Sequence, residues 1–348
     1  MEKKGVNRVF LSIILIHLLV VVILTVVPDA VSIGIAQNLI ISELILLVPG
    51  VAYILFHKKE EAFSDRMSFH KVKPSTFFMT ILFTFMIMPL TTLLNAISML
   101  FVDNAVLQIS PQVLTMPFLL IFFLMAVYGP FCEEFVFRGI IFGGYRKSGR
   151  LLCATLLSGF LFGLMHMNLN QFGYAFAMGI ALALLMEASG SIWMTMLCHF
   201  LFNAQSVCMM FLVNHFMPGL YEQQIQNQVT ANDQMYITIS VYLVIATFTT
   251  VIAACILNWI STNEGRGNLY EKLRLKTAKT DIRQAYIQNP DIQQADIYSD
   301  IQNPDIQQPG TQKSDAKKTL WTPSLVAAVI LAVLFIAVDL ILTNTFGS

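Results

Sequence analysis

The sequence predicts an all-α fold, a polytopic transmembrane helix bundle of about nine helices. Its 348 residues are 56% hydrophobic and only 12% charged, with a mean hydropathy of +0.68. Apolar stretches of about 20 residues recur along the chain, and this is the length that crosses roughly 30 Å of hydrocarbon. Basic residues lie almost entirely between alternate apolar stretches, as the positive-inside rule requires. These three observations favour a chain that crosses a membrane several times.

Nine apolar stretches have the length and composition of membrane-embedded helices. The first runs over about 19 residues without an evident small-residue cleavage site, so we expect a retained helix rather than a signal peptide. The last follows Trp321-Thr322-Pro323 and is expected to be an appended anchor. The expected ranges are 9–27, 38–56, 75–101, 116–145, 151–167, 172–188, 191–213, 236–259 and 323–343.

The 21 basic residues indicate which side of the membrane each loop faces. With the exception of Arg138, they lie in the N-terminal tail and in segments 57–74, 146–150 and 261–322. The intervening loops at 28–37, 102–115, 168–171 and 214–235 contain none. Because basic loops stay in the cytoplasm, we expect a cytoplasmic N-terminus and, with nine spans, a C-terminus on the opposite side. The expected location is the cell membrane of a bacterium.

Segment 261–322 differs in composition from the rest of the chain. It is rich in Gln, Asp and Asn and repeats IQNPDIQQ at 287–294 and 301–308. Such a segment has too little apolar material to fill a core, which predicts a flexible cytoplasmic tether. We therefore divide the chain into N-terminal transmembrane helices (1–115), a core with polar motifs (116–213), a loop and a further transmembrane helix (214–260), this low-complexity segment (261–322) and a C-terminal transmembrane anchor (323–348).

Three ionisable side chains interrupt the fourth apolar stretch, within the sequence CEEFVFRG. A charge at mid-membrane costs at least about 2.5 kcal/mol on insertion scales, so three within six residues indicate a functional site. Glu134 and Arg138 are four residues apart and about 40° around a helix axis, which predicts an ion pair. Glu133 is then the carboxylate that is not needed for the ion pair and is available for a chemical role.

Two more polar motifs follow at helical spacing. His166 comes four residues after Phe162, and His199 and Asn203 are four residues apart on a later helix, hence on one face. Counted from the cytoplasmic helix ends at 1.5 Å per residue, Glu133 lies roughly 18 Å deep, His166 about 22 Å, His199 about 12 Å and Asn203 about 18 Å. We expect the four side chains to meet. A single buried histidine is usually a packing residue, but this combination favours a site.

The three motifs, in this order and on separate apolar helices, resemble the signature of the CPBP family. These are the CAAX-processing and bacteriocin-processing intramembrane proteases, also called the Abi family, which include the type II CAAX prenyl proteases. The resemblance covers about residues 116–205 and leaves the 261–348 extension unexplained. It implies a peptidase with a water-accessible site among the helices. Its substrate would be a peptide or a membrane-anchored protein, such as a prenylated protein, a bacteriocin precursor or a pheromone precursor.

The resemblance also implies a role for each residue. Glu133 would be the general base, with His166 helping to activate the water. His199 and Asn203 would hold the oxyanion, while Glu134 and Arg138 would brace the site. An imidazole and an amide can stabilise an oxyanion in a dry pocket, so the residue types suit these roles.

The use of a metal stays open at this point. Glu133, His166 and His199 would make a plausible three-ligand zinc site with an open fourth position. However, the HExxH signature is absent, and the same residues suffice for a metal-free glutamate and histidine mechanism.

Two other classes of function stay open as alternatives. Buried carboxylates, an arginine and histidines also form the proton relays of ion-coupled transporters, although no internal repeat of the transporter kind is evident. A non-catalytic immunity or binding protein of the same fold is the other alternative. No phosphate-binding loop or nucleic-acid-binding pattern is present. Three further acidic residues in apolar stretches, Glu43, Glu187 and Asp339, have no basic neighbour in sequence, and Glu187 is expected at a cytoplasmic helix end.

Overall fold

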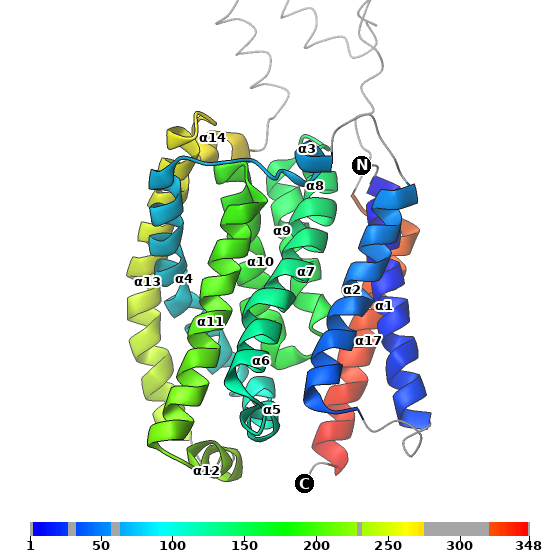
Figure 1. Cartoon of the computed structure of the whole chain (residues 1–348), viewed down its shortest axis with the longest axis vertical. Helices are drawn as coiled ribbons and strands as arrows, with labels where there is room; N and C mark the ends of the chain where they lie inside the picture. Colours follow the sequence, from blue (N-terminus) through cyan, green and yellow to red (C-terminus); the bar gives the residue numbers. More distant parts are fainter. Residues whose placement is uncertain (1–2, 27–32, 57–62, 228–231, 275–319, 347–348) are drawn as a thin grey trace, which may run out of the picture.

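Long helices lying side by side make up the computed structural model, which describes residues 3–26, 33–56, 63–227, 232–274 and 320–346 (Figure 1). All regular elements in these ranges are helical, which confirms the all-α fold class. The elements are α1 (Lys3–Val26), α2 (Ile35–Phe56), α3 (Phe63–Met67), α4 (Pro74–Ser98), α5 (Ala105–Leu114), α6 (Phe118–Phe122), η1 (Phe123–Tyr128), α7 (Gly129–Glu134), η2 (Phe135–Phe142), α8 (Gly143–Arg146), α9 (Leu151–Met165), α10 (Leu169–Ser189), α11 (Ile192–Phe216), α12 (Leu220–Asn227), α13 (Asn232–Asn263), α14 (Leu269–Leu273) and α17 (Pro323–Phe346).

Eight helices in the described part of the chain are long and apolar enough to cross a membrane, one fewer than the nine expected. The difference lies at α9, where the expected helix is present but has only 15 residues. At 1.5 Å per residue it extends about 22 Å, which is shorter than the hydrocarbon core. Helix α9 and the longer α10 form a hairpin, so the direction in which the later helices run is unaffected.

The α9–α10 hairpin is packed closely through glycines. A methyl group added at Gly179 would lie 2.7 Å from the Cα atom of Gly159, and one at Gly163 would lie 2.9 Å from the Phe172 carbonyl oxygen. Small residues at helix contacts let backbones approach closely in membrane proteins. At the tip of the hairpin, Asn170 donates hydrogen bonds to Asn95 Oδ1 and Ser98 Oγ at the end of α4. These bonds fix the hairpin against the far end of the bundle.

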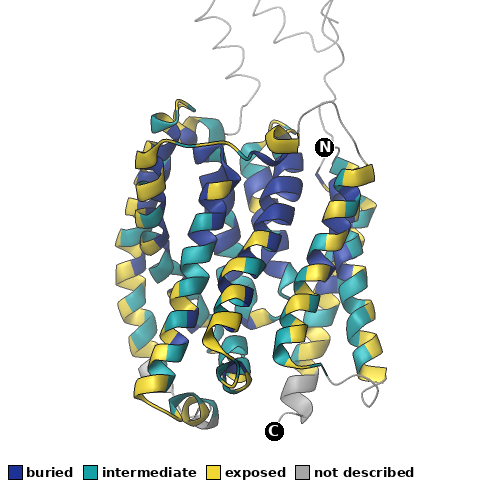
Figure 2. Ribbon diagram, viewed as in Figure 1, coloured by how far each residue is buried: buried dark blue, intermediate teal, exposed yellow. Residues whose placement is uncertain are grey.

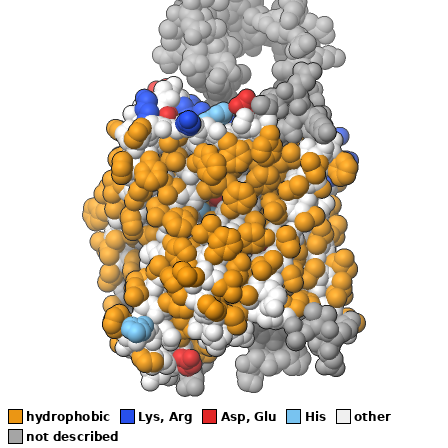
Figure 3. Space-filling model, viewed as in Figure 1, with side chains coloured by type: hydrophobic (Ala, Val, Ile, Leu, Met, Phe, Trp, Pro, Cys, Tyr) orange, Lys and Arg blue, Asp and Glu red, His pale blue; other side chains and the backbone are white. Residues whose placement is uncertain are grey.

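The surface of the bundle is apolar and its ends are polar. Figure 2 shows buried residues on the helix faces that point inward and exposed residues on the outer faces. On the face drawn in Figure 3, hydrophobic side chains cover the length of the helices, and Lys and Arg gather at the end where α3, α8 and α14 lie. This distribution is the one expected of a helix bundle embedded in lipid.

The basic end is held together by an ion cluster around Glu187. Its carboxylate lies 3.1 Å from Lys272 Nζ, 3.3 Å from Arg266 Nη2 and 3.7 Å from Arg146 Nη1. The tertiary structure therefore supplies the basic neighbours that Glu187 lacks in sequence. Residues 261–274, which the sequence assigns to the flexible segment, are folded here: α13 continues to Asn263 and α14 buries Leu269. The repeats at 287–294 and 301–308 lie outside the described residues.

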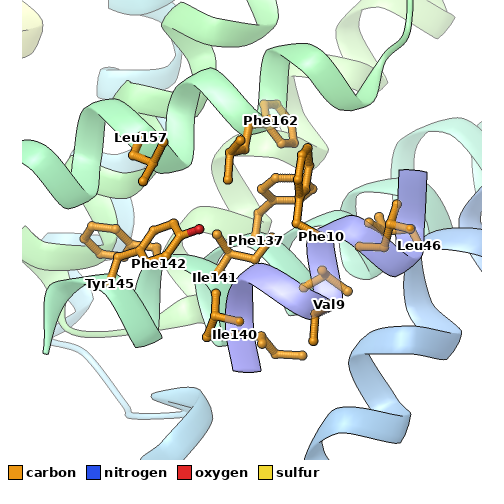
Figure 4. Packing of buried hydrophobic residues seen from close by; sticks show 14 of the residues in the cluster. Val9, Phe10, Leu46, Phe137, Ile140, Ile141, Phe142, Tyr145, Leu157 and Phe162 are labelled. Atoms are coloured by element: carbon orange, nitrogen blue, oxygen red, sulfur yellow. The ribbon is translucent and has the colours of Figure 1, made fainter. Parts of the chain in front are cut away.

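The last described helix joins the hydrophobic core at one side of the bundle, through its buried residues Leu325, Ala328 and Ala332. Helix α17 contacts α1 and α9, and its entry is fixed by Asn7, which donates to the Leu320 carbonyl oxygen and to Thr322 Oγ1. Tyr145 donates to Asn7 Oδ1 from the end of α8. Figure 4 shows the core beside these contacts, where Phe137, Ile140, Ile141 and Phe142 of η2 lie among side chains of α1 and α9.

Candidate active site

The span that carries the glutamates is not a regular α-helix. It changes from α-helix to π-helix at η1, returns to α-helix at α7 and changes again at η2. Pro130 lies at the start of α7, inside this continuous helical span, where its missing N–H leaves a carbonyl of the preceding π-segment without its usual backbone donor. Glu133 and Glu134 end α7, between the two π-segments. Such π-bulges occur frequently at functional sites, and here they set the directions of the flanking side chains.

Arg138 and Glu134 form the ion pair that their spacing predicts. Arg138 Nη1 lies 2.9 Å from Glu134 Oε1, and both side chains are fully buried. Arg138 Nη2 also donates to the Gly179 carbonyl oxygen at 3.3 Å, and the guanidinium lies over the Phe162 ring at 4.4 Å. A buried charge is costly unless it is paired and hydrogen-bonded. These three contacts therefore offset the cost of burying the Arg138 charge inside the bundle.

Glu134 joins this pair to the first of the histidines. Its Oε1 atom lies 2.9 Å from His199 Nδ1, so one carboxylate oxygen contacts both Arg138 and His199. The opposite imidazole nitrogen, His199 Nε2, lies 3.8 Å from Glu133 Oε2. The described residues offer no hydrogen-bond partner to that Glu133 oxygen. Arg138, Glu134, His199 and Glu133 therefore form one continuous chain of charged or ionisable groups.

His166 and Asn203 are each oriented by a backbone carbonyl. His166 Nδ1 lies 2.9 Å from the Phe162 carbonyl oxygen, and because a carbonyl only accepts, this nitrogen carries the proton. In the neutral ring, Nε2 is then free to accept a proton. Asn203 Nδ2 donates to the Met125 carbonyl oxygen of η1 at 2.8 Å, which leaves its second amide N–H for another acceptor.

A cavity of about 670 Å³ connects these residues. Glu133, His166, His199 and Asn203 all line it, as expected from their depths, whereas Glu134 and Arg138 do not. The motif residues are thus divided into four that face open space and two that are sealed behind them. The chemical roles expected from the sequence stay predictions.

The side chains do not form a metal site. Among the described residues, no group of three or more His, Cys, Asp or Glu side chains is arranged so that it could hold a metal ion. The possible zinc set of Glu133, His166 and His199 is therefore not assembled.

The sequence analysis gave no role to two residues that are central here. The Phe162 ring makes edge contacts with both His166 and His199, at centroid distances of 5.2 Å and 5.9 Å, and so separates the two imidazoles. Glu43 of α2 lines the same cavity as Glu133. Its signal in the sequence was an acidic residue in an apolar stretch, but nothing in the sequence indicated which helix it would face.

Comparison with known proteins agrees with the geometry. Residues 115–205 match the family model described as type II CAAX prenyl endopeptidase Rce1-like. A curated protein of Bacillus subtilis (strain 168), named "Putative membrane peptidase YdiL", is 33% identical over 84 residues. These residues are 24% of this chain and 34% of that protein, so the match spans about a third of the relative's length. No solved structure matches the chain significantly.

The family match covers α6 to the middle of α11 and contains Glu133, Glu134, Arg138, His166, His199 and Asn203. Helices α1 to α5, which supply Glu43 and part of the cavity wall, lie outside it. Segment 115–205 of this chain is therefore similar to the Rce1-like type II CAAX prenyl endopeptidases, the group that the sequence motifs resemble.

Proposed function

We propose that this protein is an intramembrane endopeptidase in which Glu133 activates a water molecule to hydrolyse a peptide bond of a membrane-associated substrate. The observation that carries the proposal is the placement of Glu133, His166, His199 and Asn203 on the wall of one cavity. The family match and the name of the curated relative support the same reaction class.

Glu133 is suited to act as the base because its Oε2 atom has no hydrogen-bond partner among the described residues. A general base must reach the proton that it removes, directly or through one water. His166 would hold the same water, since its Nδ1 donates to the Phe162 carbonyl oxygen and its Nε2 is left as an acceptor. The two groups would orient the water toward the scissile carbonyl carbon.

His199 and Asn203 are suited to hold the oxyanion that forms in this step. When the imidazole carries both protons, Nδ1 donates to Glu134 and Nε2 is free to donate to the oxyanion. The second N–H of the Asn203 amide supplies another donor. Fixed donors of this kind typically contribute a factor of about 10² to 10³ in turnover each.

Glu134 and Arg138 would act through His199 rather than on the substrate. The Arg138 charge balances Glu134, and Glu134 in turn fixes the orientation of the imidazole. The substrate would be a peptide or a lipid-anchored protein that enters a cavity whose wall is partly apolar. CAAX-type prenylated proteins and bacteriocin or pheromone precursors are the classes that we would test first.

The test is a cleavage assay with purified protein in detergent. The substrates are fluorogenic peptides, with and without a prenyl group, and the key variant is Glu133→Gln. The matched control is Glu222→Gln, which makes the same chemical change on α12, where Glu222 is exposed. We expect cleavage by the wild type and by the control, and none by Glu133→Gln. Cleavage by folded Glu133→Gln at the wild-type rate would refute the mechanism. Uptake of a solute into proteoliposomes without any cleavage would favour the transporter alternative.

A further inference from the structure

Glu43 is a second carboxylate in the cavity, supplied by a helix outside the segment that matches the family. It lies in the first half of α2, an apolar helix that contains Pro49. Both Glu43 and Glu133 line the cavity, and the two side chains are close enough to interact electrostatically. The mechanism above gives Glu43 no task.

The packing of α2 explains why Glu43 faces Glu133. Helix α2 contacts η1, α7 and η2, and it approaches closely at Gly50, where an added methyl group would lie 3.0 Å from side-chain atoms of Val136 and Ile140. Seven residues earlier, hence two turns away on the same face, Glu43 lies against Gly129. A methyl group at Gly129 would be 3.3 Å from Glu43 Oε1.

The two contacts define a parallel register between α2 and the glutamate-bearing span. Going from Glu43 to Gly50 is seven residues, and so is going from Gly129 to Val136. Glu43 is therefore level with Gly129, one turn and about 6 Å along the axis from Glu133. A glutamate side chain can cover much of that distance, so the two carboxylates approach the same part of the cavity.

The surroundings of Glu43 do not supply a balancing cation. No salt bridge or hydrogen bond to its carboxylate is present among the described residues, and its Oε2 atom is buried without a partner. Cys132 and Tyr128 of the glutamate-bearing span interact with it electrostatically, and both are neutral or negative. His17 of α1, together with His166 and His199, lines other parts of the cavity, and α4 contributes uncharged side chains to the wall.

Two interacting carboxylates in such a cavity are unfavourable if both are ionised, because like charges disfavour each other and burial penalises charge. Protonation of one of the two carboxylates removes the repulsion. Glu133 has an imidazole nitrogen 3.8 Å away, whereas Glu43 has no such neighbour among the described residues. These contacts favour the negative charge on Glu133 and the proton on Glu43.

We propose that Glu43 is the general acid of the site, holding the one proton of the carboxylate pair and donating it to the leaving amine. The inference rests on the proposed function. In the reaction, the water O–H bond breaks, its proton goes to Glu133, and the new C–O bond forms. When the C–N bond breaks, the proton of Glu43 passes to the nitrogen. Transfer of the proton from Glu133 to Glu43 then restores the resting state, and the net change is the hydrolysis of one amide bond.

The proton on Glu43 can be measured without any substrate. Infrared difference spectra of the protein in detergent, recorded against pH in D₂O, report the C=O stretch of protonated carboxyl groups. We expect such a band at neutral pH in the wild type and in Glu222→Gln, and its loss in Glu43→Gln. In Glu133→Gln, where the negative neighbour is gone, the Glu43 band should disappear at a lower pH than in the wild type. An unchanged spectrum in Glu43→Gln would overturn the proposal.

The donation step is measured by kinetics. Glu43→Gln keeps the size of the side chain but cannot transfer a proton, so we expect kcat to fall by about 10² or more with KM little changed. The alkaline limb of the kcat profile against pH should disappear in this variant, and Glu43→Asp should restore part of both. A residue that only supports the fold would lower kcat without removing a limb.

The two measurements separate failure of this proposal from failure of the proposed function. If Glu133→Gln is inactive but Glu43→Gln cleaves like the wild type with both limbs intact, the peptidase stands and the general acid is refuted. If no peptide is cleaved by any form while the infrared band behaves as expected, the proton on Glu43 is supported and the donation to an amine is refuted.

Discussion

Removing the charge of Glu134 should destabilise the protein far more than removing the charge of its neighbour Glu133. In Glu134→Gln, the guanidinium of Arg138 loses its counter-charge and keeps only neutral partners, the Gln amide oxygen, the Gly179 carbonyl oxygen and the Phe162 ring, in a position with no solvent exposure. Removing one member of a buried ion pair typically costs about 3–5 kcal/mol. This corresponds to a factor of roughly 10² to 10³ or more in the unfolding equilibrium.

The adjacent variant Glu133→Gln is the matched control. The Glu133 side chain lines the cavity, is 14% exposed and forms no hydrogen bond through Oε2, so its neutralisation leaves no charge buried without a partner. We expect its stability to remain within about 1 kcal/mol of the wild type. Both variants should be inactive, which means that stability and not activity tells the two glutamates apart.

The assay is reversible unfolding in mixed micelles with increasing denaturing detergent, followed by circular dichroism, beside the melting temperature. The double variant Glu134→Gln with Arg138→Met should recover part of the lost stability, because an apolar side chain needs no counter-charge. If Glu134→Gln unfolds at the same detergent concentration and melting temperature as Glu133→Gln, Glu134 is not the group that compensates the charge of Arg138. A double variant less stable than both single variants would also contradict the pairing.

Two further predictions concern the oxyanion donors and the topology. Asn203→Ala should lower kcat by a factor of about 10² to 10³. It should cost only about 1 kcal/mol of stability, through the lost hydrogen bond to Met125. A wild-type rate in the folded variant would show that Asn203 does not hold the oxyanion. Cysteines introduced at the exposed positions Lys71 and Gln223, in a background without the five native cysteines, should be labelled from opposite sides of intact cells, with Gln223 outside. Labelling of both from outside would contradict the expected sidedness.

The sequence by itself determined the helical class of the fold and singled out six candidate site residues, whose chemical roles stay predictions. Membrane spans can be located from sequence because lipid requires each backbone polar group to be bonded within its own helix, which leaves long apolar stretches as the signal. The pairing of Glu134 with Arg138 followed from local spacing, since residues four apart on a helix are neighbours. For the same reason His199 and Asn203 could be placed on one face.

Only the tertiary structure decided how the helices meet. In a membrane protein both the lipid-facing and the buried faces are apolar, so composition does not show which face packs or against what. The register that brings Glu43 of α2 to Gly129 of α7 depends on contacts between helices far apart in sequence. So do the bonds from Arg138 to Gly179 and from Asn203 to Met125.

The π-segments could not be predicted for a related reason. A π-turn uses the same apolar residues as an α-turn, and the choice between them is made by packing and by the partners of freed backbone groups. The residue types of the candidate site can thus be read from short sequence motifs, whereas the packing of the helices brings these residues together in one cavity.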